Sequence, residues 1–285
     1  MSAALISLRV LGPAGLIGLS ICLLHLGFAL LGPVFVLSDP AAQNAQVMLK
    51  APSVAHWFGT DRLGRDMFAR TILGGREAMF IATLSTFFAM LWGGILGVFL
   101  GLVGRWPDAV LMRVIDAMMS IPWVLMVMLF IAIFGTGMAS LIPVLSFSYG
   151  LSVVYLARAA TLSFVAEDFI WAAKARGHSP LHIVTTELLP NVQTSLAVQG
   201  AMQWSWIFLG VSSLSFLGMG VMPPTPDWGQ MIADGRGVMQ LAPWVVFWPM
   251  LALSSLVIGV NLFVDALARN FGIDRALPLP KYIAT

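Results

Sequence analysis

Residues 117–157 read AMMSIPWVLMVMLFIAIFGTGMASLIPVLSFSYGLSVVYLA, a stretch of 41 residues without a single Lys, Arg, Asp or Glu. An α-helix rises about 1.5 Å per residue, so as one helix the stretch would extend about 60 Å. A membrane crossing needs about 20 apolar residues for a hydrocarbon core about 30 Å thick. The stretch therefore predicts two crossings, with Gly135, Thr136 and Gly137 forming the turn between them.

Four more charge-free gaps are each long enough for one crossing: residues 10–38, 78–104, 188–226 and 237–264. Together with the long stretch they predict six spans, at residues 11–37, 78–104, 114–135, 139–163, 193–217 and 243–267. The first span is longer than the apolar core of a signal peptide and lacks a clear small-residue cleavage site. We therefore expect it to be retained.

The composition of the whole chain agrees with a membrane protein. Apolar residues make up 59% of it and charged residues only 10%, against about 25% charged residues in soluble domains. The expected fold class is an all-α polytopic membrane protein with about six transmembrane helices. Cys22 stands alone, which excludes an internal disulfide and a cysteine metal site. With a net charge of +2 and no polybasic run, no nucleic-acid partner is expected.

The positive-inside rule suggests an orientation. With six spans both termini lie on one side, which carries nine basic residues: Arg9, Arg105, Arg113, Arg158, Lys174, Arg176, Arg269, Arg275 and Lys281. The other side carries six: Lys50, Arg62, Arg65, Arg70, Arg76 and Arg236. Both termini are therefore expected in the cytoplasm.

Few ionisable residues lie inside the predicted spans, where they would mark an ion or proton path. Asp116, Arg158 and Asp265 stand near span ends, and the isolated His25 is expected to be a packed or interfacial histidine. The sequence also lacks a phosphate-binding GxxxxGKS/T loop, an HExxH motif and a GxSxG motif. We expect no catalytic residue and no metal site, and ATP hydrolysis would have to occur on another chain.

The segment of residues 158–191 predicts a helix that continues from the fourth span through Ala175. Gly177 ends it at a sharp corner, Ser179 and Pro180 start a short second helix, and Pro190 stops that helix before the fifth span. Such a protrusion suits docking into a groove on a partner. On spacing alone, a plain loop between two spans is an equally good interpretation.

Ala172 and Ala173, then Gly177, then Leu189 and Pro190 resemble the EAA loop of ABC importer permeases. The resemblance implies that a short coupling helix docks on an ATPase subunit. The residues it assigns to coupling are Ala172, Ala173, Gly177, His178, Ser179, Pro180, Leu181, Leu189 and Pro190. Two positions depart from the motif, because Trp171 replaces its glutamate and Glu187 its isoleucine.

Four further segments resemble one permease family within that group. Residues 56–70, HWFGTDRLGRDMFAR, are similar to its GTDxxGRDxxSR signature, and residues 216–229, FLGMGVMPPTPDWG, to its FLGLGxxxPxxxWG signature. Downstream, residues 242–249 resemble its APW and proline elements, and residues 261–269 resemble NxxGDxLR, with Val264 in place of the glycine. The resemblance covers residues 54–275 and is closest to the C-type permease of the dipeptide, oligopeptide and nickel family.

This resemblance implies an ABC type I importer permease architecture in the inner membrane of a bacterium. It divides the chain into a first helix with an outer amphipathic segment (residues 1–77), a transmembrane domain (78–275) with the EAA-like loop at 164–190, and a tail (276–285). The implied partners are membrane lipid, a B-type permease subunit that completes the pore, an external substrate-binding protein, and two ATPase subunits. The ATPase subunits would bind ATP and Mg²⁺, and this chain would bind no cofactor.

The family leaves the substrate open. Import of dipeptides or oligopeptides is the first expectation, and uptake of nickel or another small solute by the same mechanism is the alternative. A stand-alone channel or ion-driven carrier would transport without an ATPase, and the scarcity of intramembrane charge argues against it. A membrane enzyme is a more distant third possibility.

The signatures also carry physical expectations of their own. Arg62, Asp66 and Arg70 are spaced i, i+4, i+8, which predicts an amphipathic helix at the outer surface, or simply a solvated charged face. We assign the outer signature to Gly59, Thr60, Asp61, Gly64, Arg65 and Asp66. Trp228 and Trp244 are expected to be interfacial anchors. Gly93, Gly97 and Gly101 would form a helix-packing face, which permits close approach of another helix.

Overall fold

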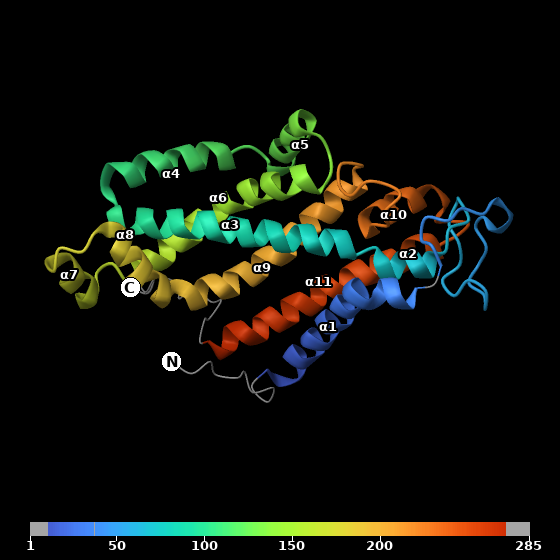
Figure 1. Cartoon of the computed structure of the whole chain (residues 1–285), viewed down its shortest axis with the longest axis horizontal. Coiled ribbons are helices and arrows are strands. Elements are labelled where there is room, and N and C mark those ends of the chain that lie inside the picture. The colour runs from blue at the N-terminus through green and yellow to red at the C-terminus, as the bar shows by residue number, and fades with distance from the viewer. Residues whose placement is uncertain (1–10, 37, 272–285) are drawn as a thin grey trace, which may run out of the picture.

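The computed structural model describes residues 11–36 and 38–271, and the only strand pairing in these ranges is a single bridge between Thr60 and Asp66. Five long helices follow the long axis of the molecule (Figure 1): α1 (Gly12–Phe35), α3 (Arg76–Val103), α6 (Met138–Leu162), α9 (Leu189–Phe216) and α11 (Trp244–Asn270). The predicted tail at 276–285, and Arg9, Arg275 and Lys281 of the charge comparison, lie outside the described residues.

Shorter elements connect the long helices (Figure 1). In chain order they are η2 (Ala45–Val47), α2 (Met67–Leu73), α4 (Arg105–Met119), α5 (Trp123–Phe134), α7 (Asp168–Ala175), α8 (Pro180–Ile183), the π-helical turn η3 (Val184–Leu188), α10 (Trp228–Gly235) and η4 (Arg236–Val238). Helices α4 and α5 lie alongside α3 and α6, and the other short elements lie toward the two ends of the molecule (Figure 1). Residues 38–66 and α10 lie at one end of the long axis, and α7 and α8 lie at the other (Figure 1). We call these the outer and the inner end.

The all-α membrane architecture is confirmed, while the count of six spans stays a prediction. Among the described residues, four helical segments are long and apolar enough to cross a membrane: α1, the α2–α3 unit, α6 and α11. The pair α4 and α5 would make a fifth if it counts as one broken span. The predicted fifth span corresponds to α9, which has 28 residues but is not among these candidates. Gln193, Gln199 and Gln203 dilute its apolar character.

The predicted third span, residues 114–135, is wrong as a single straight helix. The chain forms α4 and α5 instead, and their axes meet at 85°. Pro122 causes the break, because proline has no N–H to donate and disfavours helical geometry in the residue before it. The 12 residues of α5 extend only about 18 Å, which is less than the hydrocarbon core.

The most extensive helix contact joins α3 to α6, and we call it the glycine seam. A Cβ atom on Gly93 would lie 2.5 Å from the Gly150 carbonyl oxygen, and one on Gly101 would lie 2.8 Å from Thr161 Cβ. At Gly97 a Cβ would lie 2.7 Å from Ala157 Cβ and closer still to a backbone oxygen of α6. The two backbones therefore touch directly, as expected for small residues between membrane helices.

A second close pair, α1 and α11, packs along the side of this body. A Cβ on Gly18 would lie 2.6 Å from the carbonyl oxygen of Gly259 in α11. The expectation of a packed histidine is confirmed farther along α1. His25 is 5% exposed, its Nε2 lies 2.9 Å from Ser255 Oγ, and its ring meets that of Trp228 edge to face.

The glycine seam leads to a prediction for Gly97. A Gly97→Ala substitution should lower the free energy of unfolding by about 1–3 kcal/mol, because the new methyl group forces two backbones apart. Gly94 provides a matched control on the same helix, since a Cβ there has only Leu196 Cδ1 as a neighbour, at 4.0 Å. Gly94→Ala should be neutral or slightly stabilising. Thermal unfolding of both variants in detergent checks this, and equal midpoints would contradict it.

Candidate functional site

The inner end is built around the EAA-like loop, and its first helix does not continue from α6 as predicted. The amides of Phe164 and Val165 both donate to the Thr161 carbonyl, at 2.9 and 3.1 Å, which closes α6 in a turn. Glu167 then adopts an extended conformation at the N-cap position of a separate helix, α7. The prediction of one helix through Ala175 is therefore wrong, and α7 is an independent element whose direction the turn sets.

Gly177 forms the predicted corner. Its φ is +80° and no other atom lies within 4 Å of the place where a Cβ would be, so backbone conformation alone demands glycine here. The amide of His178 donates to the Ala173 carbonyl at 3.3 Å and ends α7. Ser179 then caps α8 by accepting from the His182 amide at 3.3 Å, with Pro180 in the first turn. The predicted glycine corner, and the start of a second helix at Ser179 and Pro180, are thus confirmed.

Pro190 does not stop the short helix, contrary to the prediction. The helix instead passes through the π-helical turn η3 and continues as α9. The amide of Leu189 donates to Val184, five residues back, and Asn191 Nδ2 donates to the Glu187 carbonyl at 2.6 Å. Proline has no N–H to donate to a helical carbonyl. The wider π-helical turn before it accommodates this missing donor, so Pro190 lies in the first turn of α9 and the helix is not broken. Helical structure therefore runs without interruption from residue 180 to residue 216.

The predicted coupling residues divide between a buried and an exposed face. Ala173 packs in an apolar cluster that joins α7 and α8 to the inner parts of α3 and α6. The side chains of Ala172, Ser179, Pro180, Leu181 and Pro190 are exposed, and those of His178 and Leu189 are partly buried. Trp171 is 61% and Leu181 63% exposed. The corner thus exposes the large apolar side chains of Trp171 and Leu181, and the helices that carry them pack on α3 and α6.

The two departures from the EAA pattern have definite surroundings. The Lys174 ammonium lies over the Trp171 ring, 5.3 Å from its centroid. Glu187 stands 3.9 Å from Arg176, so the carboxylate of η3 and the guanidinium at the end of α7 face each other across the corner. At this distance and exposure the ion pair contributes little to stability.

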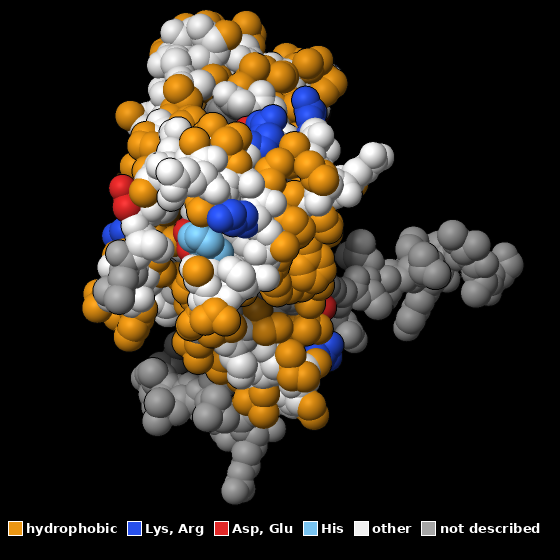
Figure 2. Space-filling model, turned by 90° about the vertical axis from the view of Figure 1, so that its right-hand side faces the viewer, with side chains coloured by type: hydrophobic (Ala, Val, Ile, Leu, Met, Phe, Trp, Pro, Cys, Tyr) orange, Lys and Arg blue, Asp and Glu red, His pale blue; other side chains and the backbone are white. Residues whose placement is uncertain are grey.

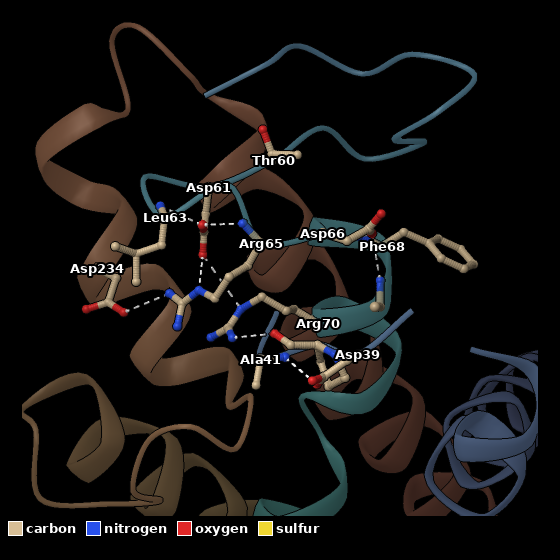
Figure 3. Close-up of polar contacts among 12 residues, drawn as sticks. Asp39, Ala41, Thr60, Asp61, Leu63, Arg65, Asp66, Phe68, Arg70 and Asp234 are labelled. Atoms are coloured by element: carbon tan, nitrogen blue, oxygen red, sulfur yellow. Dashed lines mark hydrogen bonds and ion pairs between the residues drawn. The ribbon is translucent and has the colours of Figure 1, made fainter. Parts of the chain in front are cut away.

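At the outer end, the buried carboxylate of Asp61 organises the signature loop (Figure 3). Its Oδ1 accepts from the amides of Leu63 and Arg65 at 2.8 and 2.9 Å, and its Oδ2 accepts from Arg65 Nε at 2.6 Å. The signature glycines permit close approach. A Cβ on Gly64 would lie 2.8 Å from the Asn44 carbonyl carbon, and one on Gly59 would lie 2.6 Å from Trp244 Nε1. The loop is therefore one tightly bonded unit.

The amphipathic helix predicted over this signature is wrong. Helix α2 begins only at Met67, capped by Asp66, whose Oδ1 accepts from the amides of Phe68 and Ala69 at 2.8 and 3.1 Å. Arg70 is 1% exposed, so a solvated charged face is wrong as well. The i, i+4 spacing of charges here serves a side-chain-closed loop, with Asp61 and Arg65 as its ion pair.

Trp228 is a buried connector and not the predicted interfacial anchor, while for the partly buried Trp244 the anchor role stays a prediction. Trp228 is 2% exposed and its Nε1 donates to the Thr71 carbonyl at 2.8 Å. The Nε1 of the partly buried Trp244 donates to the Thr60 carbonyl at 3.1 Å. These two bonds tie α10 to α2 and α11 to the outer loop. They were missed because the sequence does not show which carbonyl an indole reaches.

A neutral polar cavity of about 460 Å³ lies beside the break between α4 and α5. Its lining residues come from α4, α5, α6 and α9, and the polar ones are Ser120, Ser148, Tyr149, Ser152 and Gln203. The hydroxyl of Tyr149 donates to the Trp206 carbonyl at 3.1 Å, and Gln203 Nε2 donates to Ser152 Oγ at 3.4 Å. The sequence signal was the presence of polar residues inside apolar stretches, but only the fold brings them together.

Asp227 is a buried acid beside α10. It is 1% exposed, and its Oδ1 caps the helix by accepting from the Gln230 amide at 3.0 Å. Burial raises the pKa of this carboxyl from 3.8 to about 6, although hydrogen bonds from Gln230, Ser215 and Gly229 oppose the shift. The nearby Glu77 adds to the increase. The acid therefore titrates close to neutral pH.

Comparison with known proteins identifies relatives over most of the chain. The family model described as "Binding-protein-dependent transport system inner membrane component" matches residues 93–273. The chain is 32% identical over 252 residues to the dipeptide transport system permease protein DppC of Alkalihalophilus pseudofirmus, covering 88% of this chain and 83% of the relative. It is 34% identical over 218 residues to the glutathione transport system permease protein GsiD of Pectobacterium atrosepticum, covering 76% and 72%. A di/tripeptide transport system permease protein of Pseudomonas aeruginosa is 32% identical over 256 residues, covering 88% and 84%.

The raised pKa of Asp227 predicts a pH-dependent stability. Between about pH 4 and 6 the native state binds more protons than the unfolded state, so the free energy of unfolding falls as the pH rises through this window. Asp227→Asn keeps the helix cap and should abolish this fall, raising stability at pH 7 by up to about 3 kcal/mol. Thermal unfolding in detergent from pH 4 to 8 checks this, with the exposed Asp39→Asn as control. An unchanged pH profile in the Asp227 variant would contradict it.

Proposed function

The chain belongs to the family of binding-protein-dependent transport system inner membrane components, and we propose that it forms half of the membrane pathway of an ATP-driven peptide importer. Its relatives are named for transport of dipeptides, of di- and tripeptides and of glutathione. These solutes share a peptide backbone and differ in their side chains. A permease for them must accept the common backbone and tolerate the variable parts.

One observation carries the mechanism: the exposed corner at Gly177 is joined by continuous helix to the polar cavity. The helix that begins at Pro180 ends at Phe216, and Gln203 and Trp206 on it line the cavity. A force applied to α8 therefore reaches the cavity without crossing a flexible joint. ATPase subunits that bind the corner and come together when they bind ATP and Mg²⁺ would move α9 and change the shape of the cavity.

The chemistry of the cavity suits a peptide in transit. Ser148, Ser152, Gln203 and the hydroxyl of Tyr149 offer neutral donors and acceptors, and none of the cavity's lining residues is charged. Neutral groups can hydrogen-bond to peptide amides without selecting the charge of a side chain. The indole rings of Trp123 and Trp206 add apolar walls to the same cavity.

The exposed surfaces and the topology support the proposal of the remaining partners. An exposed apolar face on α5, with Leu125, Leu129 and Ile133 each at least 59% exposed, suits a B-type permease subunit that completes the pathway. The outer end, opposite the corner (Figure 1), is where an extracytoplasmic binding protein would dock. In this orientation both termini are cytoplasmic, and the membrane is the inner membrane of a bacterium.

Reconstitution tests the proposal directly. The complex of this chain with its permease and ATPase partners is placed in liposomes with the binding protein outside, and uptake of labelled dialanine is measured. Uptake that depends on ATP and on every subunit is expected. Nickel uptake under the same conditions tests the alternative substrate. Uptake by this polypeptide alone would contradict the proposal, because it would identify a stand-alone carrier.

Gly177 gives the sharpest test of coupling. Gly177→Val should reduce ATP-driven uptake at least tenfold while leaving membrane insertion intact, because a β-branched residue resists a positive φ. Gly177→Asn is the matched control, since Asn tolerates this region, and it should retain most of the uptake. ATPase activity is measured in parallel, and we expect it to persist in the Val variant without transport. Normal uptake by Gly177→Val would refute the coupling role of the corner.

A further inference from the structure

A second cavity, of about 560 Å³, opens at the outer end between the Asp61 loop, the prolines at 223–224 and α10. The mechanism above does not use it. Its charged lining residues are Asp61, Arg62, Arg65, Arg70 and Asp234. Figure 2 views the molecule from this end and shows separate blue Lys and Arg side chains set among white and orange surface.

The positive charges of this cavity are only partly matched. Arg65 lies between two carboxylates, with its Nε 2.6 Å from Asp61 and its Nη2 3.9 Å from Asp234 (Figure 3). Arg70 donates through Nη1 to the Pro40 carbonyl at 3.0 Å, but its buried Nε has no hydrogen-bond acceptor and stands 3.9 Å from Asp61. Among the described residues, the exposed Arg62 makes no ion pair.

The walls thus hold three guanidinium groups against two carboxylates. One of these groups, on Arg62, is free at the surface, and another, on Arg70, keeps an unused N–H in the interior. A buried donor without an acceptor is costly, and a guanidinium is the group that best matches a planar carboxylate. An anion in this cavity would satisfy both.

We propose that the cavity binds the C-terminal carboxylate of a short peptide, which deepens the proposed function and rests on it. The carboxylate would bind Arg62 and the free N–H of Arg70. The side chain of Asp234 is 43% exposed and only loosely held by Arg65 at 3.9 Å. It is therefore available to accept from the peptide's ammonium group. The positive groups of Arg62 and Arg70 and the negative group of Asp234 line the same cavity and together match a zwitterion.

This polarity favours a free peptide over an acidic side chain of a docked binding protein. A side chain of Glu or Asp brings a carboxylate but no ammonium group of its own, and it would leave Asp234 with only its long ion pair to Arg65. A free peptide also carries its carboxylate at a slender chain end, which can reach Arg70 although that residue is 1% exposed. The cavity would thus bind the carboxyl and amino termini, which all free short peptides have.

Binding of labelled dialanine to the purified transporter complex, with the extracytoplasmic binding protein omitted, tests the proposal. Arg62→Gln should weaken binding about tenfold, since it removes a charge-assisted hydrogen bond. Arg76→Gln is the matched control, because Arg76 is an exposed arginine near the same end that does not line this cavity. It should bind like the wild type. Equal affinity in the two variants would overturn the proposal.

Competition experiments test whether the cavity recognises the carboxylate and the ammonium group of the peptide. Unlabelled dialanine should displace the label, its C-terminal amide should not, and N-acetyl-dialanine should compete weakly in the wild type. In Asp234→Asn the acetylated and free peptides should compete equally. If the amide competes as well as the free acid, or if the wild type binds no dialanine, the carboxylate site is disproved.

The outcome is separable from that of the proposed function. ATP-dependent peptide uptake with no Arg62-dependent binding would remove this site and leave the transport function standing. Arg62-dependent binding without any peptide uptake by the complete system would support this site and contradict the proposed transport function. An acidic peptide copied from the binding protein that outcompetes dialanine would assign the cavity to docking and overturn the peptide site.

Discussion

The direct backbone contact between α3 and α6 sets the positions of the other elements. At Gly93, Gly97 and Gly101 the two helices lie too close for any Cβ atom, so the pair behaves as one rigid body. Apolar side chains on the flanks of this pair then form the clusters that receive α9, α10 and α11 on one side and the corner helices on another. In a bilayer, where burial of apolar surface does not drive helices together, such close packing is the available source of association.

The two ends of this body are built on different principles. The outer end is fixed by a buried carboxylate, because Asp61 satisfies two backbone amides and one guanidinium and leaves few free bonds to rearrange. The indole of Trp244 fastens α11 to the same loop, and the indole of Trp228 fastens α10 to α2, the helix that follows the loop. The inner end is fixed by apolar packing beneath the corner, while Gly177 itself stands in open space. Charge thus rigidifies the outer end, and an unobstructed glycine leaves the inner corner adjustable.

The sequence was informative where one local rule decides the structure. Apolar length predicted α1, α3, α6 and α11, and the need for a positive φ placed the corner at Gly177. It failed where two structures satisfy the same pattern. The i, i+4, i+8 spacing of Arg62, Asp66 and Arg70 fits a helix face. A short aspartate side chain can instead close a loop on nearby amides, as Asp61 does here. Likewise, Pro190 can end a helix or occupy the first turn of the next, and the π-helical turn before it made the second outcome possible.

The contrast between the seam and α9 limits how the molecule can move. A sliding motion of α3 against α6 would drive carbonyl oxygens into glycine backbone, so this pair must move as a unit. Helix α9 meets α3 differently: Gly200 faces the flexible side chain of Met90, whose nearest atom lies 3.3 Å from where a Cβ would be. A methionine can change rotamer to follow a neighbour, and α9 carries both the corner's continuation and two walls of the polar cavity. The soft contact and the continuous helix together make α9 the element through which a partner's force would change the cavity, while the seam remains a fixed wall.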